Sequence, residues 1–233
     1  MTRMGVWAAV ERRMRGPSMA VVVALVGLGA LGHAPAAAQD GGMEILQGAS
    51  RRYAPVRSLC ADVVHHLRVP LLDQERTARG SLCQMRPNLF AMRFNDPVGD
   101  LVVVDGEFMW YYTPSTDARQ VFKFPVTQGT RGQDFHREFL EDPETKYDVT
   151  YEAADEVAGV TTHRLRLRPK EPTSYRAAVL WIEQGTSLLR VIRIEEENGN
   201  ERTINLRNIE FDVAPPAGWF TFTPPPGTLV ITP

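Results

Sequence analysis

The sequence predicts a mainly β protein of the α+β class, built on one antiparallel sheet of about ten strands with a few short helices. Three observations support this class. Short runs from residue 59 onward alternate apolar with polar residues, which is typical of a sheet with one wet and one dry face. Asp-Gly and Asn-Gly dipeptides separate several of these runs, and only two stretches have helical periodicity.

The chain begins with the features of a secretory signal peptide. Three arginines between residues 12 and 15 precede an apolar run at 19–31, and Ala36–Ala38 follow just before Gln39. The alternative is a retained membrane anchor, but this run is shorter than the ~20 residues that a spanning helix needs. We therefore expect cleavage after Ala38, export to the periplasm, and a single domain over residues 39–233.

Charge and length limit what this domain can do. The leader holds four of the 26 Lys and Arg residues and one of the 28 Asp and Glu residues, so residues 39–233 carry a formal net charge of −5. A mildly acidic domain argues against nucleic acid as a partner, because phosphate binding needs clustered basic residues. The length suits one domain with a substantial core.

Two stretches are predicted to be amphipathic helices. Residues 43–54 place Leu46, Ala49 and Tyr53 on one face, with two arginines opposite and Pro55 behind them. Residues 131–141 group three apolar residues and leave Arg137, Glu138 and Glu141 outside. The apolar members of this second stretch are Phe135, Phe139 and Leu140.

The first strands are predicted at 59–69 and 79–86, and each carries one cysteine. If their hairpin centres near Leu71 and Leu72, Cys60 faces Cys83 directly. An exported pair of cysteines favours a disulfide over the alternative of two buried small hydrophobic residues. We therefore expect a Cys60–Cys83 bridge.

Later segments repeat the strand pattern. Residues 162–168 point Leu165 and Leu167 one way and three arginines the other, while turn dipeptides stand at 105–106 and 198–199. A sheet of this size must curl, stack or be covered, because a bare apolar face would aggregate. Two short helices can cover it only in part, which favours a pocket, although a filled core is the alternative.

The sequence contains no recognisable catalytic or metal motif. It has no Gly-x-Ser-x-Gly or His-Glu-x-x-His element, and adjacent His65 and His66 on a strand point to opposite faces. His136 and His163 have no ligand-spaced neighbours. We expect no enzyme activity, no metal and no cofactor, while paired carboxylates from distant strands stay an alternative.

Aromatic residues are the positive signal for ligand binding. Alternation places those of 90–94 on one strand face and those of 108–112 on another. As cavity walls they would offer apolar surface to acyl chains, although ordinary core packing is the alternative for each one. The predicted cavity residues are Phe90, Met92, Phe94, Val103, Phe108, Trp110, Tyr112 and Phe122.

Several elements occur in an order that resembles the LolA family of periplasmic lipoprotein carriers. A Gly-x-Leu-x-x-x-Arg-Pro-Asn-x-Phe element runs from Gly80 to Phe90, and Asp105-Gly106 precedes Trp110, Tyr112 and Pro114. The chain then ends in a Phe-x-Phe-x-Pro-Pro-x-Gly element at 220–227. This resemblance implies an incomplete antiparallel β-barrel whose helices form a lid over an apolar cavity.

The resemblance also implies a role and partners. The arginine of Arg-Pro-Asn, here Arg86, would hydrogen-bond to lid backbone and latch the empty carrier, and Phe90 would lie at the cavity rim. Without the family, Arg86 reads as a surface residue at a strand end. The implied partners are acylated lipoproteins, an inner-membrane Lol ABC transporter and a LolB-like outer-membrane acceptor, with the carrier acting as a monomer. The alternative is a half-barrel of the RseB type that senses lipoproteins or binds another lipid.

Overall fold

The computed structural model describes residues 37–126 and 134–232, with side chains from residue 41 onward. Its contacts divide the chain into residues 1–34 and residues 35–233, and the second unit holds every described element. Residues 1–36 of the predicted signal peptide lie outside the described residues. The start of the predicted second helix, residues 131–133, also lies outside them.

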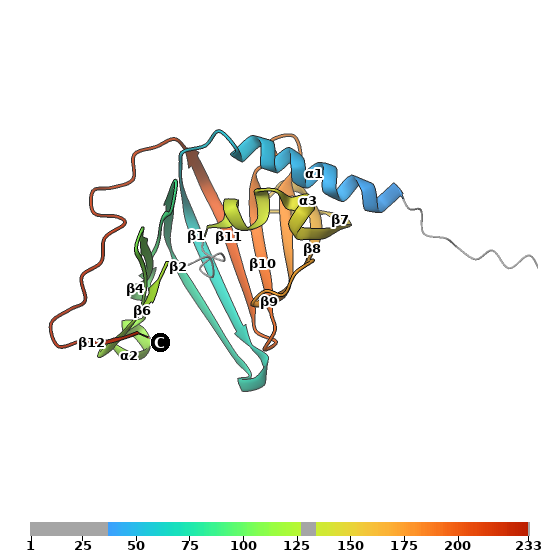
Figure 1. Cartoon of the computed structure of the whole chain (residues 1–233). Helices are drawn as coiled ribbons and strands as arrows, with labels where there is room; N and C mark the ends of the chain where they lie inside the picture. The colour runs from blue at the N-terminus through green and yellow to red at the C-terminus, as the bar shows by residue number, and fades with distance from the viewer. Residues whose placement is uncertain (1–36, 127–133, 233) are drawn as a thin grey trace, which may run out of the picture. The chain divides into compact units, whose positions relative to one another are not determined.

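The described part of the chain forms one twelve-stranded sheet, which is mainly β as predicted (Figure 1). Its strand order is β12-β6-β5-β4-β3-β2-β1-β11-β10-β9-β8-β7. Neighbouring strands are antiparallel except for β12 and β6, which are parallel. The sheet is curved and stays open between β7 and β12. The strands are β1 (Ser58–Val69), β2 (Gln74–Met85), β3 (Leu89–Asp96), β4 (Val98–Asp105), β5 (Phe108–Tyr112), β6 (Gln120–Pro125), β7 (Tyr147–Val157), β8 (Val160–Pro169), β9 (Tyr175–Glu183), β10 (Leu189–Glu196), β11 (Glu201–Phe211) and β12 (Leu229–Ile231).

In β8 the apolar and the polar residues lie on opposite faces of the strand, as the sequence predicted. Leu165 and Leu167 are fully buried, while Arg164 and Arg166 point to the other face and pair with acids such as Glu152. The predicted hairpin turns are also confirmed, because Gly106 and Gly199 adopt positive φ angles of 101° and 86° between their strands. The same alternation gives β7 and β8 one apolar face and one polar face.

Helix α1 (Ala37–Tyr53) crosses one face of the sheet and contacts β7, β8 and β9 (Figure 1). Its predicted inner face is confirmed, because Leu46, Ala49 and Tyr53 are buried. The helix begins earlier than residue 43. The shorter helical elements are η1 (Pro70–Leu72), α2 (Pro114–Asp117), η3 (His136–Leu140) and α3 (Pro143–Lys146).

The second predicted helix is a single π-helical turn, η3, rather than a helix over 131–141. Its apolar residues Phe135, Phe139 and Leu140 are buried as predicted. Glu138 was expected outside and is instead buried, with 6% of its surface exposed. The wider π turn directs its carboxylate inward, where the Tyr147 hydroxyl donates to it at 3.0 Å.

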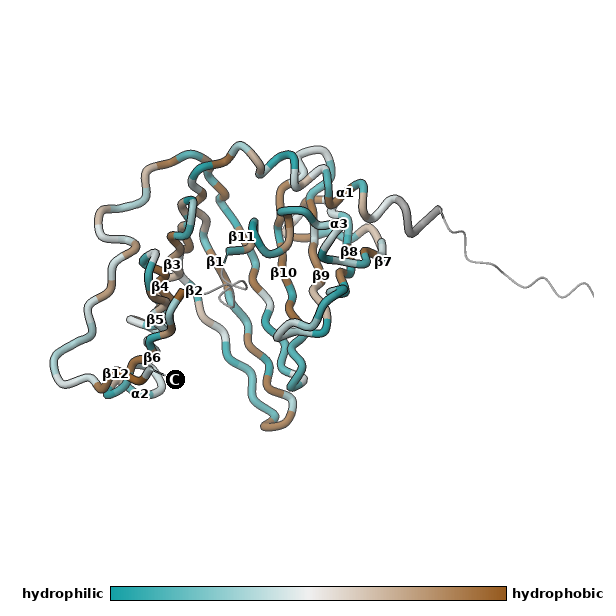
Figure 2. The backbone as a smooth tube through the Cα atoms, viewed as in Figure 1, coloured by the Kyte–Doolittle hydropathy of each residue, from teal (hydrophilic) through white to brown (hydrophobic). Residues whose placement is uncertain are grey.

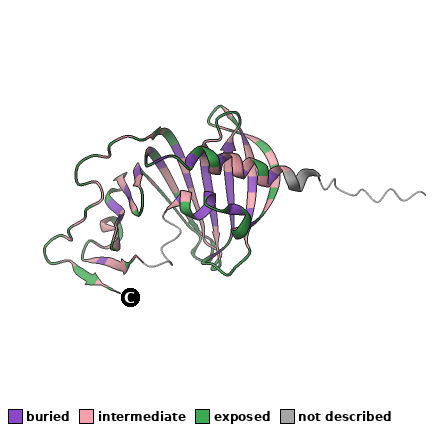
Figure 3. Cartoon of the chain, turned by 45° about the horizontal axis from the view of Figure 1, so that its top comes forward, coloured by how far each residue is buried: buried purple, intermediate pink, exposed green. Residues whose placement is uncertain are grey.

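The main core lies between α1, η3 and the concave face of the sheet. Apolar residues concentrate along the strands there, and buried residues gather beneath α1 and α3 (Figures 2 and 3). A second, smaller core lies on the convex face of β3–β6. There Ala91, Leu101 and Val103 pack against Trp219, Phe220 and Phe222 of the segment that follows β11.

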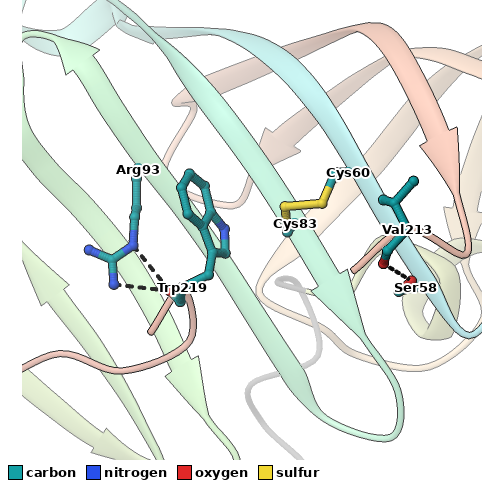
Figure 4. The surroundings of a disulfide bond; sticks show 6 residues. All are labelled: Ser58, Cys60, Cys83, Arg93, Val213 and Trp219. Carbon is teal, nitrogen blue, oxygen red and sulfur yellow. Dashed lines mark hydrogen bonds between the residues drawn. A yellow bond between two sulfur atoms is a disulfide. The ribbon is translucent and has the colours of Figure 1, made fainter. Parts of the chain in front are cut away.

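Cys60 on β1 and Cys83 on β2 are joined by a disulfide (Figure 4). They stand directly opposite each other in the register, as a hairpin centred at Leu71 and Leu72 requires. Ala91 continues the same row on β3, so the bridge lies on the convex face beside the second core. It closes a loop with a sequence separation of 23 residues.

We expect this bridge to stabilise the fold measurably. Closing a loop of this length restricts the unfolded chain and contributes about 3 kcal/mol. The double variant Cys60→Ser/Cys83→Ser should lose about that free energy of unfolding in urea titrations. Reduced wild-type protein should match the variant, and equal midpoints for oxidised, reduced and variant protein would contradict the prediction.

Candidate functional site

The concave face holds an apolar cavity of about 680 Å³ where the sheet is left uncovered by α1. This volume lies within the ~300–1,000 Å³ that is usual for small-molecule sites. Residues from eight strands, β1–β6, β10 and β11, form its walls. The apolar lining residues are Leu67, Ala78, Met92, Phe94, Pro97, Leu101, Val102, Met109, Phe124, Phe135, Ile194 and Ile204.

Sheet register explains why these side chains converge. Met92 on β3 stands opposite Val102 on β4, which stands opposite Tyr111 on β5. Met109 likewise stands opposite Phe124 on β6. Residues directly opposite in an antiparallel pair share a face, so every second residue of β3–β6 points to the concave face that holds the cavity.

The predicted cavity residues divide between the two faces. Met92 and Phe94 line the cavity, while Phe90 is buried in the core and meets the Phe135 ring edge-on with centroids 5.9 Å apart. Phe122 pairs with Tyr111 and so lies on the concave face, although it is not part of the lining.

The prediction was wrong for Val103, Phe108, Trp110 and Tyr112, which lie on the convex face. Val103 and Tyr112 belong to the second core, and Trp110 packs against that core. Phe108 shares their face, and the centroid of its ring lies 6.3 Å from that of the Trp110 ring. The cavity is lined instead by Met109 and Tyr111, the alternate residues of the same strand.

The convex face is apolar because the C-terminal segment covers it. Arg93 holds this cover in place, with Nε and Nη2 donating to the Trp219 carbonyl oxygen at 3.0 and 2.9 Å (Figure 4). Its Nη2 also donates to the Thr221 carbonyl oxygen at 2.6 Å. Strand β5 has the apolar cavity on one face and the C-terminal segment on the other, so all five of its residues are apolar or aromatic and alternation does not distinguish the two faces.

A second hollow lies at the other end of the concave face, where α1 and η3 cover the sheet. We call α1 and η3 together the lid. This hollow measures about 30 Å³, so the packing there is nearly complete. Phe135 lines both hollows and therefore stands between them. The concave face is thus filled under the lid and open beyond it.

Arg86 lies at the junction of the sheet and the lid, just beyond the end of β2. Its Nη1 donates to the Ala54 carbonyl oxygen at 2.8 Å, and its Nη2 donates to the Tyr53 carbonyl oxygen at 3.0 Å. These oxygens belong to the C-terminal end of α1, where carbonyls lack helical partners and the helix dipole is negative. A guanidinium there caps the helix and ties it to the sheet.

The same guanidinium contacts η3 through His136. Arg86 Nη2 lies 2.9 Å from His136 Nε2. A guanidinium can only donate, so this bond requires a neutral His136 whose Nε2 accepts. Burial and the nearby Arg86 charge lower the pKa of His136 below its usual value, which favours that neutral form. Arg86 therefore joins both parts of the lid.

Two further polar contacts anchor the lid to the sheet. The Leu189 backbone N–H donates to the Tyr53 hydroxyl at 3.0 Å, and burial raises the pKa of Tyr53 to about 12. Tyr147 and Tyr175 both reach Glu138, with their hydroxyl oxygens 2.7 Å apart. Burial, together with the bond to Glu138, raises the pKa of Tyr175. No local pattern in the sequence signals these contacts, because their members are far apart along the chain.

Polar groups at the site do not form a metal-binding cluster in the described ranges. No group of three or more His, Cys, Asp or Glu residues is placed to hold a metal ion among residues 41–126 and 134–232. His65 lines the cavity, and burial lowers its pKa to about 4, which keeps it neutral. No helix in the described part of the chain has the length and apolarity needed to cross a membrane.

The open sheet, the partial lid and the apolar cavity define a half-barrel protein that can take up a hydrophobic ligand. The family described as "Outer membrane lipoprotein carrier protein LolA" matches residues 69–223. The chain belongs to this LolA family, whose carrier proteins are not enzymes.

Individual relatives agree with this assignment. An outer-membrane lipoprotein carrier protein of Haemophilus ducreyi is 30% identical over 72% of this chain and 75% of its own length. One from Photobacterium profundum is 28% identical over 78% of this chain and 86% of its own length. A crystal structure of an uncharacterized conserved protein from Thermus thermophilus shares the fold, with a TM-score of 0.50 and 15% identity over 83% of this chain and 99% of that one.

The Arg86–His136 contact predicts that acid loosens the lid. A histidine whose pKa is lowered by folding stabilises the closed form fully above its free pKa of about 6.5, and this stabilisation is lost as the pH falls below that value. Binding of a hydrophobic dye should therefore rise between pH 7.5 and 5.5. The charged groups that act on His136 are Arg86, Asp134, Glu141 and Lys146.

His136→Asn should remove most of this acid response, because an amide oxygen can accept from Arg86 at every pH in the range. His163→Asn is the matched control, since His163 lies on β8 away from Arg86, and it should keep the response. An unchanged response in His136→Asn would contradict the prediction.

Proposed function

We propose that the mature chain is a periplasmic carrier that binds the acyl chains of lipoproteins released from the inner membrane and delivers them to the outer membrane. The observation that carries this proposal is the apolar cavity of about 680 Å³ beside a lid that Arg86 fastens. Burying acyl chains there is favourable by about 25 cal/mol per Å² of apolar surface removed from water. Membership of the LolA family supports the same role.

Lid movement would enlarge the binding space. Phe135 separates the two hollows, so displacing η3 would join them into one longer groove. The buried apolar residues of the lid, such as Leu46 and Phe139, would then face the cargo. The closed lid and the bound acyl chains compete for this same apolar surface. Cargo release is then favoured by lid closure, and uptake needs the lid to open.

The proposal includes the export signal and the partners. Residues 1–38 would be removed on export, an inner-membrane ABC transporter would load the carrier, and an outer-membrane acceptor would unload it. No covalent chemistry is needed at any step, because binding and release only exchange one apolar environment for another. The carrier would act as a monomer.

Site-specific crosslinking on opposite faces of β5 tests the carrier role. With p-benzoylphenylalanine at position 109, the mature protein should release lipoproteins from spheroplasts and crosslink to them, because Met109 lines the cavity. At the adjacent position 110, release should persist without crosslinking, because Trp110 packs on the convex face. Absence of lipoprotein release in both would overturn the carrier role, and a sensor of lipoproteins would give crosslinks without release.

The latch at Arg86 predicts a defect in unloading. Arg86→Leu removes charge-assisted hydrogen bonds at a solvent-exposed position, worth about 1–2 kcal/mol in total. A loss of this size raises the open-lid population about 5–30-fold. The variant should stain more strongly with a hydrophobic dye when empty and accumulate in its lipoprotein-bound form.

Arg79→Leu is the matched control for this variant. Arg79 lies on β2, the strand that leads to Arg86, but its guanidinium pairs with Asp96 at 2.9 Å rather than with the lid. It should show neither effect. Normal hand-off and unchanged dye binding in Arg86→Leu would refute the latch while leaving the carrier role standing.

A further inference from the structure

The open end of the cavity carries two arginines in one row of the concave face. Leu67 on β1 stands opposite Arg76 on β2 and, on its other side, opposite Arg202 on β11. Residues directly opposite in antiparallel pairs share a face, so the arginines flank Leu67 on three adjacent strands. Both arginines and Leu67 line the cavity. A cationic row therefore follows directly on the apolar walls.

Most of the acids near this row are already engaged. Asp96 pairs with Arg79 at 2.9 Å, whereas Asp100 accepts hydrogen bonds from the neutral Ser115 and keeps its negative charge. Arg202 pairs with Glu196.

Arg76 differs, because Nη1 donates to the neutral Thr116 hydroxyl at 2.9 Å, and no carboxylate pairs with it within the described residues. Of the two arginines in the row, Arg76 is therefore the one whose positive charge is not neutralised by an ion pair among the described residues.

The electrostatic effect of the row extends into the cavity. Burial lowers the pKa of His65, and the Arg202 charge lowers it further; His65 is the next residue of this face along β1 and is paired with Ile204. At Tyr111, another residue of the lining, burial and the Asp100 charge raise the pKa, and the Arg202 and Arg76 charges lower it. The charges of the row therefore act on two side chains of the cavity wall, His65 and Tyr111, with Asp100 opposing them at Tyr111.

We propose that this row binds the anionic phosphate headgroup of a lipid whose acyl chain lies along Phe94, Met109 and Phe124. The guanidinium fork matches phosphate oxygens with paired hydrogen bonds, and Thr116 adds a hydroxyl beside it. The diacylglyceryl and acyl groups of a lipoprotein offer no such charge. The cavity would therefore accept anionic phospholipids in addition to the proposed lipoprotein cargo.

Binding of lipids with one chain and different heads tests this proposal. Titration calorimetry below the micelle concentration should show 1-myristoyl-lysophosphatidylglycerol binding about tenfold more tightly than 1-myristoylglycerol, which has the same chain and a neutral head. Arg76→Gln should reduce this preference to about twofold or less. Arg76→Lys should keep part of it, because the charge remains while the fork is lost.

Arg68→Gln is the matched control, since Arg68 follows Leu67 on β1, points to the opposite face and pairs with Glu75. It should leave the preference unchanged, and circular dichroism melts should show that all variants are folded. Inorganic phosphate at the same concentration should not displace the lipid, because it has no chain to bury. Displacement by phosphate would mean an anion site without a lipid and would overturn the proposal.

Two further results would overturn it. One is equal affinity of wild-type protein for the charged and neutral lipids, or no binding of either. The other is a preference that persists when Arg76 and Arg202 are both replaced by Gln. Lipoprotein release from spheroplasts is scored separately in the same variants, so failure of the headgroup site is distinguishable from failure of the carrier role.

Discussion

The structure is governed by a curved sheet whose apolar concave face is larger than the helices available to cover it. Twelve strands form that sheet in the described part of the chain, and its two ends stay unpaired with each other. Helix α1 and the turn η3 cover one end of the concave face, and the hollow left between them and strands β1, β2, β10 and β11 measures only about 30 Å³. Beyond them the same face stays hollow. Exposing apolar surface to water is unfavourable in free energy, so binding of a ligand that covers this surface would be favourable.

Two arginines attach separate elements of the chain to the two faces of the sheet. Arg86 donates to carbonyl oxygens at the end of α1, and Arg93 donates to carbonyl oxygens of the C-terminal segment. In each case a guanidinium satisfies backbone acceptors of an element that has few other polar contacts with the sheet. The two differ in what lies beneath. The segment held by Arg93 brings Trp219, Phe220 and Phe222 onto the second core, whereas the lid held by Arg86 competes with cargo for its apolar surface in the proposed function.

The sequence predicted the fold well because its signals were local. Alternation in β8, the turn glycines at 106 and 199, and the buried face of α1 each follow from neighbouring residues. The hairpin register that brings Cys60 opposite Cys83 also followed from the position of one turn, near Leu71 and Leu72. The cavity wall was predicted less well, since β5 is apolar on both faces and the reason lies about 110 residues away in the C-terminal segment. Glu138 was misjudged for a similar reason, because its partners Tyr147 and Tyr175 come from other elements. The contact of His136 with Arg86 was not predicted, since the two residues are 50 positions apart.

The distribution of charge inside the half-barrel determines what kind of binding it can support. At the lid, the Arg86 guanidinium meets backbone oxygens and the neutral His136, so opening the lid exposes it to water at little electrostatic cost. The walls at Met92, Val102 and Met109 offer only dispersion and burial, which are non-directional and tolerate chains of different length. Directional recognition is therefore confined to the rim, where Arg76 and Arg202 stand. In the proposed function, a binding site organised in this way would discriminate poorly among acyl chains and would select its ligands by what lies at their polar end.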